Sequence, residues 1–138
     1  MEHNFKLNFL DHVAIRVKDL ELSVNWYQNV LGLRKYKLEK WGEFPIFMLL
    51  GKFGVALFPS HLDDDPLNLK SNNVKIDHFA FNVNHADFKK AKQKYTELGL
   101  DFEIQDHYYF DSIYTKDPDG HIVELTTLKV DEDMFYGK

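Results

Sequence analysis

The chain has 138 residues, of which 44% are hydrophobic and 28% charged, with a net charge of −5 and no cysteine. This length and composition fit one compact globular domain, residues 1–138. The acidic balance argues against a nucleic-acid partner, and the absence of cysteine excludes disulfides, thiolate metal ligands and a cysteine nucleophile. No signal segment opens the chain and no apolar run is long enough to cross a membrane, so we expect a cytoplasmic protein without a membrane partner.

An internal repeat organises the chain. Residues 10–17 read LDHVAIRV and residues 76–83 read IDHFAFNV, so an Asp-His pair recurs 66 residues later and four of the eight positions are identical. A duplicated segment of sequence predicts a duplicated structure.

The first copy is followed by an amphipathic helix pattern. Apolar residues recur at helical spacing from Leu22 to Leu33, and Gly32 is placed to end the helix with a left-handed cap. Three runs typical of β-strands follow, at residues 34–39, 44–50 and 54–58.

The second copy shows the same succession. Residues 59–74 contain turn-forming residues without periodicity and are interpreted as the linker. A helix pattern from Asp87 to Leu100 then ends at Gly99, and strand patterns follow at residues 102–105, 111–116 and 121–127.

Each half therefore predicts a strand, a helix and three strands, which makes the fold α+β. The two βαβββ modules span residues 8–58 and 75–128. Paired modules of this kind form a curved, eight-stranded half-barrel, whose inner surface is the natural place for a pocket.

These features resemble the vicinal-oxygen-chelate superfamily of glyoxalases, bleomycin-resistance proteins, fosfomycin-modifying enzymes and extradiol dioxygenases. The resemblance covers residues 8–128 and is carried by the duplicated His strand and by the ending DPDGHIVEL, residues 117–125. It implies that one divalent metal ion is held by His12, His78 and Glu124.

Two imidazoles and one carboxylate occupy one face of an octahedral ion and leave the opposite positions open for substrate. This ligand set does not distinguish iron, manganese, zinc and nickel. Glyoxalase-type members carry a fourth ligand on the last strand of the first half, at the position equivalent to Glu124. Aligning the two halves places Leu57 at this position. Leu57 cannot bind a metal, so we expect it to line the substrate pocket beside a three-ligand site.

Further pocket residues are expected around the strand that precedes Glu124. Tyr114 lies ten residues before Glu124, and the resemblance implies that it donates a hydrogen bond to the metal-bound substrate. Ser112 shares the face of Tyr114, while His107 and Tyr108 lie in the loop before them, and all three are expected to contact substrate. His121 is expected to point away from the site, because it alternates with Glu124 along the strand.

The resemblance implies an enzyme that acts on a small substrate chelating the ion through adjacent oxygens. Residues 104–110, IQDHYYF, offer little positive charge to a phosphonate, so fosfomycin-type chemistry is disfavoured here. Dioxygenase-like chemistry is placed slightly ahead of lyase or isomerase chemistry. The alternative is a metal-free protein that sequesters a drug, as bleomycin-resistance proteins do. The resemblance implies a homodimer, since relatives of this length usually work as homodimers and often take their metal ligands from both chains; the sequence leaves open whether this dimer exchanges modules.

Overall fold

The structure is a computed structural model that describes residues 4–61 and 76–136. The chain divides into two compact units, Met1–Asp64 and Asp65–Lys138, and each is described by itself. The first contains, in chain order, β1 (His12–Val17), α1 (Leu20–Leu31), β2 (Arg34–Tyr36), the 3-10 turn η1 (Glu39–Trp41), β3 (Ile46–Leu50) and β4 (Phe53–Pro59). The second contains β5 (Phe79–Asn82), α2 (His85–Glu97), β6 (Phe102–Asp106), β7 (Phe110–Lys116), β8 (Ile122–Leu128) and the short α3 (Glu132–Phe135).

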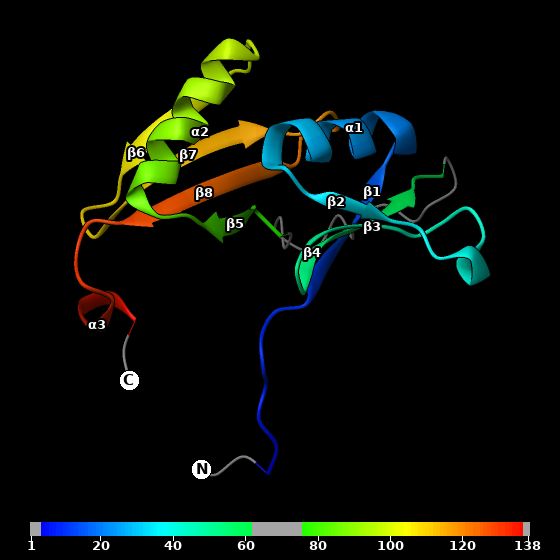
Figure 1. Cartoon of the computed structure of the whole chain (residues 1–138), viewed down its shortest axis with the longest axis horizontal. Coiled ribbons are helices and arrows are strands. Elements are labelled where there is room, and N and C mark those ends of the chain that lie inside the picture. Colours follow the sequence, from blue (N-terminus) through cyan, green and yellow to red (C-terminus); the bar gives the residue numbers. More distant parts are fainter. Residues whose placement is uncertain (1–3, 62–75, 137–138) are drawn as a thin grey trace, which may run out of the picture. The chain divides into compact units, whose positions relative to one another are not determined.

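Both units have the same topology, with sheets ordered β1-β4-β3-β2 and β5-β8-β7-β6. In each sheet the first strand pairs in parallel with the last, and the remaining pairs are antiparallel. One helix covers one face of each sheet (Figure 1). The prediction of two βαβββ modules is confirmed, whereas the joining of the two sheets around one hollow stays a prediction.

The helices begin and end at the signals that the sequence contains. Asp19 and Asn84 cap the N-termini by accepting hydrogen bonds from the amides of Leu22 and Asp87. Beyond the C-termini, Gly32 and Gly99 adopt the left-handed conformation, with φ of 71° and 69°.

Several strand boundaries differ from the prediction. The run predicted at residues 34–39 ends at Tyr36, because residues 39–41 form the turn η1. The run predicted from Phe44 begins at Ile46, after Pro45, which has no amide hydrogen for the ladder. Most of the predicted linker, residues 62–74, lies outside the described residues, and Pro59 belongs to β4.

Alternation along the strands gives each sheet two different faces. In the second module, Ile113, Val123 and Leu125 are buried beneath α2. Ser112, Tyr114 and Glu124 take the alternate positions and lie on the opposite face. The apolar core therefore fixes the face on which the polar residues are presented. None of the helices in the described parts of the chain has the length and apolar character needed to span a bilayer.

Tyr95 of α2 places a hydroxyl group in the apolar core of the second module. Its side chain is 1% exposed, and its hydroxyl has no hydrogen-bond partner among the described residues. Burial raises the pKa of this phenol above its ordinary value, because the phenolate would be poorly solvated. The free energy gained by packing the ring is partly offset by the unsatisfied hydroxyl.

We predict that Tyr95→Phe raises the free energy of unfolding by about 1 kcal/mol, because it removes a buried polar group without leaving a cavity. Because the pKa of Tyr95 is raised in the folded state, its contribution to the free energy of unfolding is constant below pH of about 10. At higher pH the phenol ionises more readily in the unfolded state, so this contribution is lost. Between neutral and alkaline pH, the free energy of unfolding measured with urea should therefore fall less in the variant than in the wild type. Tyr36→Phe, at a half-exposed position, is the control and should change little; a clear loss of stability in Tyr95→Phe would contradict the assignment.

Candidate metal centre

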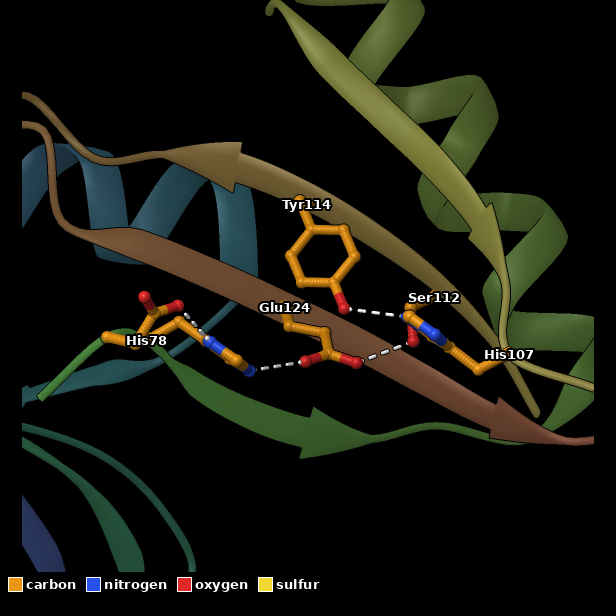
Figure 2. Close-up of polar contacts among 6 residues, drawn as sticks. His78, His107, Ser112, Tyr114 and Glu124 are labelled. Carbon is orange, nitrogen blue, oxygen red and sulfur yellow. Dashed lines mark hydrogen bonds and ion pairs between the residues drawn. The ribbon is translucent and has the colours of Figure 1, made fainter. Parts of the chain in front are cut away.

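Parallel pairing in the second module brings His78 to Glu124. Ala80 of β5 lies opposite Glu124 of β8, and His78 lies two residues before Ala80, on the same face of the extended chain. The Nε2 atom of His78 is 2.9 Å from Oε1 of Glu124, and Figure 2 marks this contact with a dashed line. Two of the three predicted metal ligands are therefore neighbours within this module.

Both side chains are held by further contacts. The Oε2 atom of Glu124 accepts a hydrogen bond of 2.5 Å from the buried Ser112 hydroxyl. The Nδ1 atom of His78 lies 2.8 Å from Oδ1 of Asp77. The Glu124 side chain is only 6% exposed, so a buried carboxylate on this face needs a positively charged partner.

The 2.9 Å separation between His78 and Glu124 limits what can lie between them. A deprotonated Nε2 and a carboxylate oxygen are both lone-pair acceptors and repel at this distance. A proton or a metal ion must therefore be shared by the two atoms. An imidazole nitrogen and a carboxylate oxygen are donors that iron, manganese and zinc all accept, so the residues present fit a divalent metal.

Tyr114 lies directly across the β-ladder from Glu124. Its hydroxyl is 2.8 Å from Nε2 of His107, which lies in the loop between β6 and β7 (Figure 2). Desolvation, and after it the negative charge of Glu124, raise the pKa of the Tyr114 phenol above its ordinary value. Tyr114 is therefore a neutral hydrogen-bond donor near neutral pH.

A cavity of about 690 Å³ opens beside these residues, a size suited to a small organic molecule. Its lining includes His78, Tyr114, Glu103 and Gln105. Glu103 and Gln105 lie opposite Tyr114 and Ser112 in the ladder with β6, so they share the face of the site. No sequence motif indicated that these two residues belong to the site.

Of the two residues expected from the loop between β6 and β7, one contacts the site around Glu124. His107 contacts Tyr114, whereas the Tyr108 side chain is 78% exposed and its ring contacts Tyr109. Tyr108 has a positive φ of 73°, which turns the chain between the two side chains. His121 is bound to Asp117 in the turn before β8, away from this group as expected.

His12 has a similar setting in the first module. It opens β1, and its Nδ1 atom is 2.7 Å from Oδ1 of Asp11. The ring lies against Phe47, with centroids 4.9 Å apart. Opposite His12 is Gly54, where a Cβ atom would overlap the carbonyl oxygen of Met48, so this position requires glycine.

The strand register corrects the placement of Leu57. Ala14, two residues after His12, lies opposite Ala56, whereas Leu57 lies opposite Ile15 on the buried face beneath α1. Ala56 is therefore the counterpart of Glu124, and Leu57 is a core residue, not part of the pocket. Alanine is also unable to bind a metal, so the first module still offers no fourth ligand at this position.

Within residues 4–61 and 76–136, no three His, Asp or Glu side chains form a group able to hold a metal ion. His78 and Glu124 meet in the second module, and His12 belongs to the first. The complete three-ligand site therefore stays a prediction.

Comparison with known proteins settles the family. Residues 9–125 match the model of the Glyoxalase/Bleomycin resistance protein/Dioxygenase superfamily. The chain belongs to this superfamily. The resemblance inferred from the repeated Asp-His strand and the final DPDGHIVEL segment is thus confirmed.

The relatives of this superfamily member include proteins named for thiol transfer. It is 29% identical over 119 residues to Glutathione transferase FosA of Serratia marcescens, covering 86% of this chain and 80% of the relative. It is also 29% identical over 134 residues to Metallothiol transferase FosB of Lysinibacillus sphaericus, covering 94% and 89%. The crystal structure of Fosfomycin Resistance Protein FosX from Mesorhizobium loti matches with a TM-score of 0.64 and 27% identity, over 94% of this chain and 99% of that one.

Proposed function

We propose that the protein is a metal-dependent enzyme whose divalent ion is held by His12, His78 and Glu124. The observation that carries this proposal is the pairing of Nε2 of His78 with the buried carboxylate of Glu124 at 2.9 Å. Two lone-pair donors at this distance favour a shared cation. The His12 ring, with its own Asp partner, supplies the third ligand of the proposed set.

When bound, the ion supplies Lewis acidity toward the oxygens of a small chelating substrate. Ser112 holds the outer oxygen of Glu124 and so fixes the orientation of the carboxylate. Tyr114, a phenol that is neutral near pH 7, donates a hydrogen bond to a substrate oxygen that gains negative charge. Nε2 of His107 lies 2.8 Å from the Tyr114 hydroxyl, and by donating to the phenol oxygen it would leave the phenol hydrogen for the substrate.

The reaction we propose is the addition of a thiol to a small electrophile, with addition of water as the second candidate. Relatives named Glutathione transferase and Metallothiol transferase, at 29% identity, support thiol transfer ahead of the dioxygenase-like chemistry that the sequence favoured. In the proposed step the sulfur forms a bond to carbon as a carbon–oxygen bond opens. The proton released by the thiol then ends on the new hydroxyl.

The charges beside the cavity favour an uncharged substrate over a phosphonate. The cavity lining carries three acidic residues, Asp77, Asp101 and Glu103, against one lysine, Lys116. A phosphonate dianion would therefore meet net negative charge in the lining. We therefore propose a neutral electrophile with adjacent oxygens as the substrate class.

The first prediction concerns metal retention. His78→Ala and Glu124→Ala should each lower manganese or zinc occupancy from one ion per chain to nearly zero, because each removes a ligand from a three-ligand set. Occupancy is measured by elemental analysis of protein purified without chelator, and folding by circular dichroism. His121→Ala is the matched control, since His121 is also bound to an aspartate but lies away from the site. Wild-type protein without metal that binds a flat ligand tightly would favour the sequestration alternative.

The second prediction concerns the reaction. With glutathione or cysteine and Mn²⁺, a neutral epoxide bearing an adjacent oxygen should yield the thiol adduct, and fosfomycin should yield less. Tyr114→Phe should lower kcat roughly tenfold to a thousandfold while metal occupancy is kept, because the variant lacks one donor to the developing charge. Products are followed by mass spectrometry. Cleavage of a catechol with no adduct from any epoxide would restore the dioxygenase assignment.

The third prediction concerns the dimer that the family resemblance implies. We propose that His12 of one chain joins His78 and Glu124 of the other. His12→Ala and His78→Ala proteins should each lose the metal alone. After mixing and subunit exchange, each heterodimer should bind metal at one of its two sites. That site combines His12 of the His78→Ala chain with His78 and Glu124 of the His12→Ala chain. No recovery from heterodimers verified by native mass spectrometry would place the ligands within one chain, and a monomer in sedimentation would remove the dimer.

A further inference from the structure

The aspartate that precedes each metal-site histidine makes the same contact in both modules. Oδ1 of Asp11 lies 2.7 Å from Nδ1 of His12, and Oδ1 of Asp77 lies 2.8 Å from Nδ1 of His78. The aromatic neighbours of the two histidines differ, since Phe47 lies against one ring and Tyr114 against the other. The contact is therefore common to two otherwise different surroundings.

This contact determines which nitrogen of each ring is able to bind a metal. A neutral imidazole carries its proton on one nitrogen and a lone pair on the other. A carboxylate has no hydrogen to donate, so Nδ1 must be the donor, and Nε2 keeps the lone pair. In the second module, Nε2 is the nitrogen that faces Glu124, so a metal ion bound by both atoms would replace the proton that they otherwise share.

We propose that Asp11 and Asp77 are positioning residues that hold the proton on Nδ1 and aim Nε2 of their histidines at the metal. This inference rests on the proposed metal site. Carboxylate partners of this kind also make the imidazole more basic, and their loss typically weakens metal binding tenfold to a hundredfold.

The exposure of these two aspartates distinguishes a positioning role from a role in folding. The side chains of Asp11 and Asp77 are 65% and 73% exposed, so their contribution to folding is small. Asp117 differs, because its fully buried side chain contacts His121 and also accepts hydrogen bonds from the amides of Asp119 and His121. Asp117 supports a turn, whereas the contacts of Asp11 and Asp77 act on the ring orientation.

The first arm of the test measures metal affinity. Zn²⁺ alone is the probe, and its Kd for the full-length chain is obtained by competition with a chromogenic chelator. Asp11→Ala and Asp77→Ala should each weaken binding roughly tenfold to a hundredfold. Asp11→Asn and Asp77→Asn should weaken it less, because the amide oxygen still accepts from Nδ1 although the charge is gone.

The second arm reads the tautomer without any metal. Long-range ¹H–¹⁵N spectra at pH of about 8.5, above the ordinary pKa of imidazole, should show the proton on Nδ1 of His12 in the wild type and a mixture of His12 tautomers in Asp11→Ala. His12 is the ring to read, because Nε2 of His78 shares a proton with Glu124 when no metal is bound. Asp87→Ala removes an exposed carboxylate whose ion pair with Lys90 is 3.9 Å long. This control should change neither the affinity nor the spectra.

The inference is overturned if the Ala variants bind Zn²⁺ as tightly as the wild type, or if His12 of the wild type carries its proton on Nε2. A wild type that binds no metal would instead overturn the proposed function, and the tautomer spectra would still decide whether Asp11 holds the proton on Nδ1 of His12.

Discussion

The buried carboxylate of Glu124 is the constraint around which the second module is arranged. Its side chain is almost removed from water, and it lies on a sheet face opposite the apolar core. A carboxylate there is tolerated only when its oxygens are satisfied. Ser112 satisfies one oxygen, and the His78 ring faces the other. A proton on the His78 ring, or a metal ion bound by both residues, balances the negative charge of this carboxylate.

The strand topology explains why these residues meet although they are distant in the sequence. Parallel pairing of β5 with β8 brings His78 to Glu124, and antiparallel pairing of β7 with β8 brings Tyr114 opposite the same residue. The loop before β7 then returns His107 to the Tyr114 hydroxyl. The site is therefore built on rigid strands, with one loop residue in contact, and the core beneath α2 fixes its orientation.

The repeat and the helix signals were sufficient to predict the two modules, because a strand and a capped helix are local patterns. The face of Glu124 followed from alternation along a single strand. Leu57 was misplaced because register depends on pairing between strands, and a shift of one residue moves a side chain to the other face. The contact between His107 and Tyr114 was also not predictable, since it depends on the left-handed turn at Tyr108. The Asp-His pairs were visible in the sequence, but the direction of each Asp side chain was not.

The site and the family together narrow the chemistry further than either does alone. Family membership covers isomerisation, oxygen chemistry, thiol transfer and sequestration, so it fixes the fold and leaves the reaction open. The proposal of thiol transfer follows the names of the relatives, and the cavity lining adds a constraint on the substrate, because Asp77, Asp101 and Glu103 outnumber Lys116 there. A lining with this excess of negative charge is better suited to an uncharged electrophile than to a dianion. Specificity within the family would then be set by charge around the proposed metal centre, since carboxylates in the lining repel a dianion.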